Sequence, residues 1–451
     1  MNRVASICFF LLISFISNAK QPPNIIVIMV DDMGYGGVSS FANQYYQTPE
    51  IDRLAAEGLQ LMDYHSNGVV CTPTRASLMT GLYPQRTGSH LVFNASPEHE
   101  DYQRGLPKQV LTFPEALKQS GYVSAIFGKW HLGYKAEFNP LNHGFDQFNG
   151  FISGNIDAHF QYDRVGTFDW WQNDKLNEQL GYHSDLITDN TLEFIENNKD
   201  KPFFIYVSHG APHDPLQARG SKIKRGPNKG KVPKWGIGQP TYSEKPGDND
   251  WLMQHIVLAA DEGVGKIRQQ VERLGLADNT IIWFVSDNGG TTANHTVSEL
   301  TRGKKADLYE GGHRVPGIVW APKMVKPGIS NALVTSMDIM PTNLVQANVI
   351  LPKELHLDGI DLGPVLFEHK AQAERTIFWG NLDKKKGVVV RNGLALRQGS
   401  WKLVNDELYD LSSDPQEKHN IAQQYPQKLQ AMQKEVKAMF NNALRDSPYD
   451  N

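Results

Sequence analysis

The chain has 451 residues, of which 40% are hydrophobic and 21% are charged, and it contains 39 glycines and 25 prolines. This composition is that of an ordinary globular protein and excludes disorder, collagen and coiled coil. Lys and Arg number 45 against 49 Asp and Glu, which gives a net charge of −4. A chain without excess positive charge has no general attraction for nucleic acid, so we expect no nucleic-acid partner.

The first 19 residues have the features of a secretory signal. Arg3 precedes an apolar run over residues 4–16, and Ser17-Asn18-Ala19 supplies a small-x-small cleavage site. The run is too short to span a bilayer comfortably, so we expect cleavage, export to the periplasm or the extracellular space, and no stable membrane insertion. Export would leave Cys71 as the one cysteine in an oxidising compartment, where a lone thiol is ordinarily buried and inert.

Four short apolar runs rich in β-branched and aromatic residues are predicted to be buried strands. They lie at residues 24–30, 123–127, 203–207 and 281–285, and each is followed by polar or charged residues. Helical patterns lie between them at residues 49–57, 113–119, 184–197 and 251–274. This alternation predicts an α/β fold with a large, mostly parallel sheet sandwiched by helices. Sites in such sheets form beyond the carboxyl ends of the strands. We therefore expect the polar residues that come directly after these four strands to share one cleft.

The pattern changes after about residue 351. Short alternating segments at 387–391, 394–397 and 401–404, separated by Gly and Asn turn signals, predict a small antiparallel sheet. Residues 426–444 are predicted to form a terminal amphipathic helix. We therefore expect a signal peptide at 1–19, a catalytic α/β domain at 20–350 and a C-terminal α+β subdomain at 351–451. The irregular stretch 218–246 is predicted to be a surface insertion.

Cys71 begins a segment typical of a helix N-terminus, because Pro73 suits the first turn of a helix. The helix dipole and Arg75 would both stabilise a negatively charged adduct at position 71. One interpretation is a thiolate enzyme with a nearby histidine base. Hard oxygen ligands, however, follow two of the predicted strands: Asp31, Asp32, Asp287 and Asn288. Soft sulfur does not match a site for a hard cation.

The segment Cys71-x-Pro-x-Arg75, with Thr80-Gly81 behind it, resembles the signature of the formylglycine-dependent sulfatases. These are the type I sulfatases of the alkaline-phosphatase-like superfamily. Further blocks resemble that family in its own order: Asp31-Asp32, residues 128–133, residues 211–213, Asp287-Asn288-Gly289 and residues 302–312. Residues 395–403 and 407–411 resemble the family's C-terminal part, so the resemblance spans residues 24 to about 421. It implies an alkaline-phosphatase-like fold and a sulfuric ester hydrolase.

The resemblance also implies the chemistry of position 71. A formylglycine-generating maturation enzyme would oxidise Cys71 to 3-oxoalanine (formylglycine), and the hydrated aldehyde would offer oxygen to the metal and a hydroxyl nucleophile to the substrate. The mismatch of sulfur with the hard ligands then disappears. One divalent cation, Ca²⁺ with Mg²⁺ as the alternative, would be held by the following ligands: Asp31, Asp32, Asp287, Asn288 and the converted Cys71.

Other residues acquire roles by the same resemblance. Lys129 and Lys305 would neutralise sulfate oxygens, and Arg75 would steady the aldehyde hydrate. His213 would protonate the departing sugar oxygen, and His131 would assist the release of sulfate in a second step. Lys304, which precedes Lys305, is the alternative for the second lysine.

Substrate-binding residues are less clearly marked. Asn155, Asp157 and His159 lie in a region that varies between family members and are candidates for either substrate binding or structure. His209 and His295 are assigned structural roles at least as readily as functional ones. Basic residues of the insertion could form a rim for an anionic sugar chain or a merely solvated loop: Lys222, Lys224, Arg225, Lys229, Lys231 and Lys234. Trp170, Trp171 and Trp235 could stack on sugars or belong to the core.

Export favours a carbohydrate sulfatase that acts on a sulfated polysaccharide or oligosaccharide, such as carrageenan or a glycosaminoglycan. One alternative is a phosphodiester or phosphonate monoester hydrolase of the same superfamily, although Asn288 suits one hard cation and not the histidine-rich two-zinc sites. Another is a catalytically inactive secreted sugar-binding protein. The sequence leaves the oligomeric state and the sulfated position open.

Overall fold

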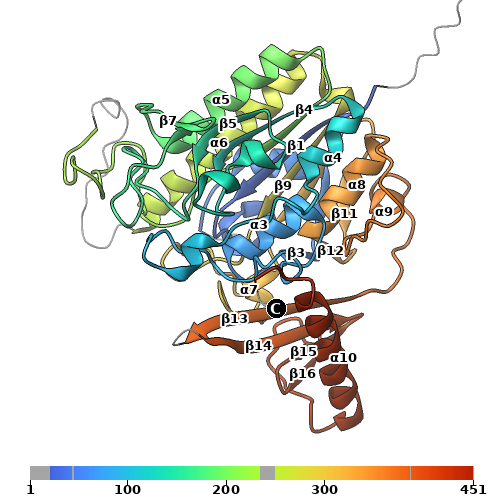
Figure 1. Ribbon diagram of the computed structural model, residues 1–451. Coiled ribbons are helices and arrows are strands. Elements are labelled where there is room, and N and C mark those ends of the chain that lie inside the picture. The colour runs from blue at the N-terminus through green and yellow to red at the C-terminus, as the bar shows by residue number, and fades with distance from the viewer. Residues whose placement is uncertain (1–20, 43–44, 234–248, 386–387, 450–451) are drawn as a thin grey trace, which may run out of the picture.

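The computed structural model describes residues 21–42, 45–233, 249–385 and 388–449. The predicted signal at 1–19, Lys234 and Trp235 lie outside these residues. The described residues form a ten-stranded sheet, a two-stranded sheet, a four-stranded sheet and the helices that cover them (Figure 1).

The large sheet has the strand order β11-β2-β10-β9-β1-β8-β4-β5-β6-β7. Its strands are Asn24–Val30 (β1), Leu59–Leu61 (β2), Val123–Lys129 (β4), Gln147–Phe151 (β5), Trp171–Gln172 (β6), Lys175–Leu176 (β7), Phe203–Ser208 (β8), Thr280–Ser286 (β9), Gly317–Trp320 (β10) and Gly328–Ser330 (β11). Strands β9, β1, β8, β4 and β5 are parallel, whereas β10 and β6 run antiparallel to their neighbours. The predicted mostly parallel sheet is confirmed, and the four predicted strands lie side by side at its centre.

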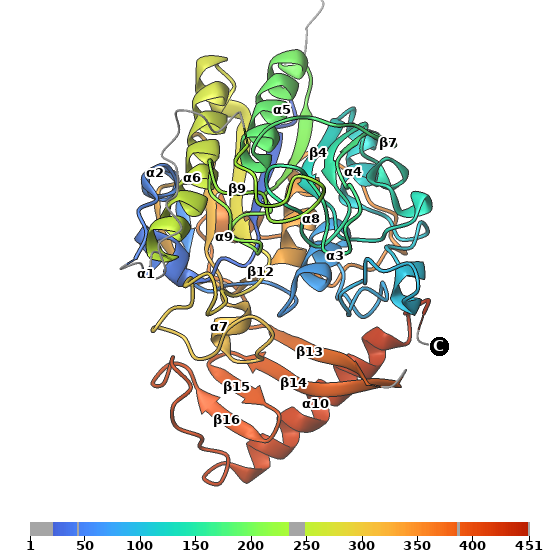
Figure 2. The same cartoon turned by 90° about the vertical axis from the view of Figure 1, so that its left-hand side faces the viewer.

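Helices cover both faces of the sheet (Figure 2). They are Ser39–Ala42 (α1), Pro49–Glu57 (α2), Cys71–Thr80 (α3), Phe113–Leu117 (α4), His183–Asn198 (α5), Asn249–Arg273 (α6), Ile339–Gln346 (α8) and Gly363–Leu366 (α9). Strand β1 shows how the two cores form, because Ile26 and Ile28 pack with α2, α5 and α6, while Ile25 and Val27 pack with α3, α4 and α8. Successive side chains of a strand point to opposite faces, so a strand that is covered on both sides must be apolar throughout.

The C-terminal part forms the four-stranded antiparallel sheet β13-β14-β15-β16 and one long helix. These elements are Thr376–Lys385 (β13), Val388–Gln398 (β14), Trp401–Val404 (β15), Glu407–Asp410 (β16) and Pro426–Leu444 (α10). The predicted antiparallel sheet and helix are therefore present. The two strands expected at 387–391 and 394–397 belong to one strand, β14. The pairing register with β13 shifts between Asn381 and Leu382, so Asn392 is the extra residue of a β-bulge and does not form a turn.

Candidate active site

The carboxyl ends of β1 and β9 bring four of the predicted metal ligands together. The two strands are paired in parallel up to Val30 and Ser286, so the residues that follow them leave the sheet side by side. The backbone N–H of Asp32 donates to Asp287 Oδ1 at 3.1 Å, and Asn288 Nδ2 donates to Asp32 Oδ1 at 2.7 Å. Asp31, Asp287 and Asn288 are completely buried and Asp32 nearly so. This edge of the sheet therefore concentrates three carboxylates and an amide in a buried space.

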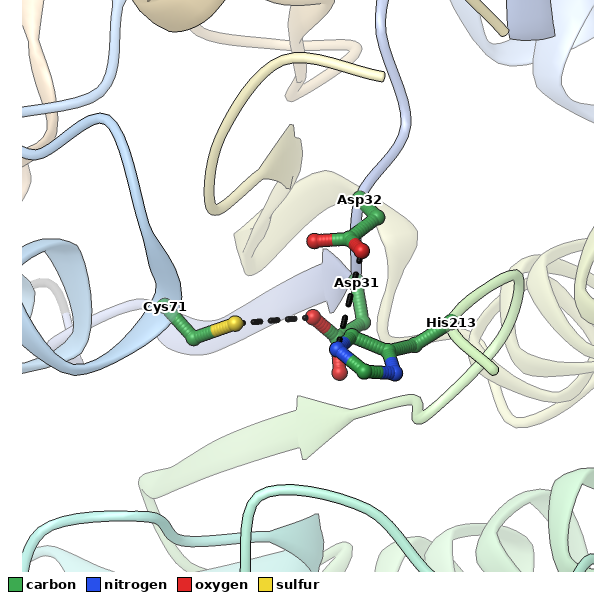
Figure 3. Close-up of side chains that lie close together, drawn as sticks. All are labelled: Asp31, Asp32, Cys71 and His213. Atoms are coloured by element: carbon green, nitrogen blue, oxygen red, sulfur yellow. Dashed lines mark hydrogen bonds and ion pairs between the residues drawn. The ribbon is translucent and has the colours of Figure 1, made fainter. Parts of the chain in front are cut away.

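Cys71 is the first residue of α3 and points into this space. Its Sγ lies 3.3 Å from Asp31 Oδ1 and 3.5 Å from Lys305 Nζ, and the ligand atoms of Asp31, Asp32, Cys71 and His213 lie within 4.8 Å of one another (Figure 3). Burial, followed by the charges of Asp287 and Asp31, raises the pKa of the Cys71 thiol. Unmodified Cys71 is thus a protonated thiol among hard oxygen ligands.

Arg75, one turn further along α3, binds the carboxylate of Asp287 and lies close to that of Asp31. Its Nε and one terminal nitrogen donate to Asp287 Oδ2 at 3.1 and 2.8 Å, and the other terminal nitrogen donates to Ser208 Oγ at 2.6 Å. The guanidinium is completely buried and lies 3.9 Å from Asp31 Oδ1. These hydrogen bonds fix the position of Asp287. The role of Arg75 toward a modified residue 71, which the resemblance implies, stays a prediction.

Two lysines reach this cluster, each at a different carboxylate. Lys129, the last residue of β4, lies with Nζ 2.6 Å from Asp31 Oδ2, and Lys305 Nζ lies 2.6 Å from Asp32 Oδ1. Although burial opposes the charged forms, the charge of Lys129 lowers the pKa of Asp31, and those of His213 and Lys305 lower the pKa of Asp32. Lys304 is exposed and its side chain is absent from this set of contacts, so the structure places Lys305 at the cluster.

A buried ion network anchors the segment that carries Lys305. A Cβ on Gly289 would lie 1.9 Å from the carbonyl oxygen of Gly311, so the segment packs directly on the backbone beyond Asn288. Behind it, Lys402 Nζ of β15 lies 2.8 Å from Glu310 Oε1 and 2.8 Å from His313 Nε2. Both partners belong to the short helix Glu310–His313 (α7). The C-terminal sheet thereby holds the segment that positions Lys305.

Two histidines face the pocket above the cluster. His213 Nε2 lies 3.6 Å from Asp32 Oδ2, and its Nδ1 lies 2.8 Å from the carbonyl oxygen of Asp214 and 3.3 Å from Asn155 Nδ2. His131 is buried, and Nδ1 has no hydrogen-bond partner within the described ranges. Burial and then the charge of Lys129 lower the pKa of His131 well below its usual value. Both histidines line the pocket.

The pocket has a volume of about 400 Å³, within the range of ~300–1,000 Å³ that is usual for small-molecule sites. It is lined by Cys71, Val92, Phe93, Asn94, Ala95, His131, Tyr134, Ser153, Gly154, Asn155, Arg164, His213 and Lys305. Sequence reasoning missed Phe93, Tyr134 and Arg164, because nothing in the chain order shows that the segments 92–95 and 134–164 reach Cys71.

Of the three predicted substrate-binding residues, Asn155 lines the pocket and the other two do not. Asp157 is completely buried, and its carboxylate accepts hydrogen bonds from the backbone N–H groups of His159, Lys224 and Arg225. His159 is also completely buried, with Nε2 3.2 Å from the carbonyl oxygen of Ala218. Asp157 and His159 thus hold the described part of the insertion, which is the structural role that is one of the two expectations for them.

Several other predicted residues lie away from the pocket. His209 is completely buried, His295 Nδ1 lies 3.0 Å from Asp250 Oδ1, and Trp170 is part of the core. These residues take the structural roles that were one of the two expectations.

The donor set fits a hard divalent cation. Asn288 Oδ1 is buried and accepts no hydrogen bond from any residue that the structure describes, although its Nδ2 group makes two. A buried amide oxygen is ordinarily paired, and an unpaired one beside three carboxylates is the ligand type that calcium and magnesium take. Asp31, Asp32, Asp287 and Asn288 are thus the residues that would hold the ion.

Chelation is expected to destabilise the protein. An ion that binds only the folded state, and is present at a free concentration 100 to 1,000 times its Kd, adds about 3 to 4 kcal/mol to the free energy of unfolding. We therefore expect EGTA to lower Tm in a thermal scan and added Ca²⁺ to restore it, with a smaller calcium-dependent shift in Asn288→Ala. A Tm that is insensitive to both chelator and added ion would show that no cation is held here.

Comparisons with known proteins agree with this geometry. The family model described as Sulfatase matches residues 23–349, and the one described as N-sulphoglucosamine sulphohydrolase, C-terminal, matches residues 303–446. Human N-acetylgalactosamine-6-sulfatase is 32% identical over 386 residues, which cover 80% of this chain and 69% of the relative. Bovine arylsulfatase A is 29% identical over 95% of this chain and 90% of its own.

Solved structures show the same relationship. The crystal structure of Ps i-CgsB in complex with k-i-k-neocarrahexaose has a TM-score of 0.82 and 27% identity, and the match covers 96% of this chain and 95% of that one. The chain belongs to the sulfatase family. It is therefore a sulfuric ester hydrolase, and its fold is of the α/β class. None of the helices in the described residues is both long enough and apolar enough to cross a membrane.

Proposed function

We propose that this enzyme is an exported carbohydrate sulfatase that removes sulfate from a sulfated polysaccharide or oligosaccharide, with formylglycine made from Cys71 and one divalent cation, Ca²⁺, as its cofactors. The observation that carries the proposal is the position of Cys71: its thiol lies 3.3 Å from Asp31 in a cluster of oxygen ligands and two lysines. Hard ligands favour an oxygen nucleophile at this position over sulfur.

The formylglycine and the divalent cation would each supply one part of the chemistry. When formed, the formylglycine hydrate provides an oxygen nucleophile that a maturation enzyme must first create. When bound, the divalent cation neutralises negative charge on the sulfate. Asp31, Asp32, Asp287 and Asn288 would hold the ion, and Arg75 would keep Asp287 in place.

The chain's own side chains would carry the remaining steps. Lys129 and Lys305 would neutralise sulfate oxygens as charge develops on them. His213, in its protonated form, would give its proton to the departing sugar oxygen, because an alkoxide leaves poorly at neutral pH. His131 would accept a proton during the release of sulfate. Two features support a sugar substrate: the pocket volume of about 400 Å³ and the neocarrahexaose complex of Ps i-CgsB.

The test is a substrate panel with protein coexpressed with a formylglycine-generating enzyme. Sulfate release is measured from carrageenan and glycosaminoglycan oligosaccharides, and hydrolysis of para-nitrophenyl sulfate and bis-para-nitrophenyl phosphate is measured in parallel. We expect sulfate release from a sulfated oligosaccharide with the highest kcat/KM of the panel. Hydrolysis of the phosphodiester alone, or of no substrate although residue 71 is converted, would contradict the proposal.

A further inference from the structure

The pocket extends from the catalytic cluster to a charged side chain that the proposed reaction does not use. Its lining includes Cys71, His213 and Lys305 of the cluster and also Arg164. A group bound beside Cys71 therefore shares one continuous cavity with the Arg164 side chain. The cluster itself already supplies two lysines for the sulfate that is cleaved, so Arg164 is additional positive charge.

A rigid turn presents Arg164 to the pocket. Asp163 Oδ1 accepts hydrogen bonds from the backbone N–H groups of Val165 at 3.0 Å and Thr167 at 2.8 Å, and the Asp163 N–H donates to the Thr167 carbonyl at 2.9 Å. The neighbouring pair Tyr162 and Phe168 closes the turn as an antiparallel bridge. Asp163 is 5% exposed, and its carboxylate accepts hydrogen bonds within the turn itself.

The guanidinium of Arg164 is left without a counter-charge. Arg164 is exposed and makes no ion pair or hydrogen bond with any residue in the described ranges. An arginine held on a fixed turn at the edge of a pocket, without a carboxylate of its own, is suited to bind an anionic oxygen group from a ligand.

A second arginine, Arg225, contacts the wall of the pocket. Arg225 donates to Asn155 Oδ1 at 2.8 Å, and Asn155 is itself part of the pocket wall beside His213. Burial and then the charge of Arg164 lower the pKa of Arg225, although Asp214 lies 3.9 Å away. Arg225 is not part of the pocket lining, and the charges of Asp214, Asp157 and Asp163 act on it. Its hydrogen bond therefore holds Asn155 in the pocket wall, while Arg164 is the arginine that lines the pocket.

We propose that Arg164 binds a second anionic group of the substrate while the scissile sulfate lies at Cys71, with Arg225 holding Asn155 in the wall of the same pocket. The group would be a sulfate or a carboxylate on the same sugar or on the adjacent one, so the preferred substrate carries at least two negative charges. This inference rests on the proposed function and adds a requirement for substrate charge to it.

The experiment compares substrates with one and two anionic groups. The probes are a monosulfated sugar, the same sugar with a second sulfate, and the monosulfated sugar linked to a uronate. For Arg164→Ala, we expect the ratio of kcat/KM for a doubly charged substrate to that for the singly charged one to fall about 10- to 100-fold, mainly through KM. Arg164→Lys should recover part of the ratio, because a lysine keeps the charge without the planar fork.

Arg53→Ala is the matched control, because it removes the same group from the surface of α2, where Arg53 pairs only loosely with Glu57 at 3.7 Å. Its ratio should equal that of the wild type. An unchanged ratio in Arg164→Ala would overturn the inference while sulfate release continued. If the wild type released no sulfate from any probe, the proposed function itself would fail. A lowered ratio for the disulfated probe alone would assign the group as sulfate, and for the uronate alone as carboxylate.

Discussion

Replacement of Cys71 by serine is expected to lower kcat by at least about a thousandfold, as the loss of a catalytic nucleophile does. Serine fills the same buried space and can still hydrogen-bond to Asp31 and accept from Lys305, so the contacts of Sγ at 3.3 and 3.5 Å are retained. A serine hydroxyl, however, cannot form the hydrate of an aldehyde. The change should therefore remove activity while the free energy of unfolding stays within about 1 kcal/mol of the wild type.

The measurement is single-turnover sulfate release together with chemical denaturation. Ser77→Ala serves as the control, because Ser77 is buried on the same helix and its Oγ has no hydrogen-bond partner among the described residues. This control should keep wild-type turnover. Near wild-type turnover in Cys71→Ser would mean that residue 71 is not converted to the nucleophile.

Asp287→Asn is expected to remove both activity and much of the stability. Asp287 is completely buried and balances the completely buried guanidinium of Arg75, which it binds at 2.8 Å. Removing one partner of a buried ion pair leaves the other charge unpaired and costs about 3–5 kcal/mol. The same substitution weakens a metal ligand, so the activity should fall with the stability.

Asp185→Asn is the matched control for that experiment. Asp185 also pairs with an arginine, Arg219, at 2.9 Å, but its side chain is 33% exposed and the pair lies outside the pocket lining. Because water reaches this partly exposed pair, its loss should cost less than the loss of the completely buried Arg75–Asp287 pair. Urea denaturation in Ca²⁺ and in EGTA measures both variants. Equal stability losses in Asp287→Asn and Asp185→Asn would contradict a central role for the Arg75–Asp287 pair.

The sequence was informative where a physical pattern is local. An apolar run with both faces buried predicts β1 and β9 at or within one residue of their ends, and the apolar spacing of residues 426–444 predicts α10. The rule that sites form at the carboxyl ends of parallel strands then brings Asp31 and Asp287 together without knowledge of the pairing order.

The structure was needed where the deciding contact is distant in sequence. Lys304 and Lys305 are adjacent and chemically identical, and only the structure shows that Lys305 reaches Asp32, at 2.6 Å, while Lys304 is exposed. The sequence cannot distinguish the Asp157 carboxylate from one that binds a ligand. In the structure it accepts hydrogen bonds from the backbone N–H groups of Lys224 and Arg225, more than sixty residues away. No sequence motif marks Arg164. Only the structure shows that it lines the same pocket as Cys71.

The most direct test of the central claim is peptide mass spectrometry of residue 71 in protein coexpressed with a formylglycine-generating enzyme. Conversion of the thiol to the aldehyde lowers the mass of the Cys71 peptide by about 18 Da, and an aldehyde-specific label identifies the product when it is hydrated. We expect the labelled aldehyde, in a fraction that rises in proportion to sulfatase activity between preparations. Full activity in protein whose residue 71 is entirely an unmodified thiol would contradict the claim.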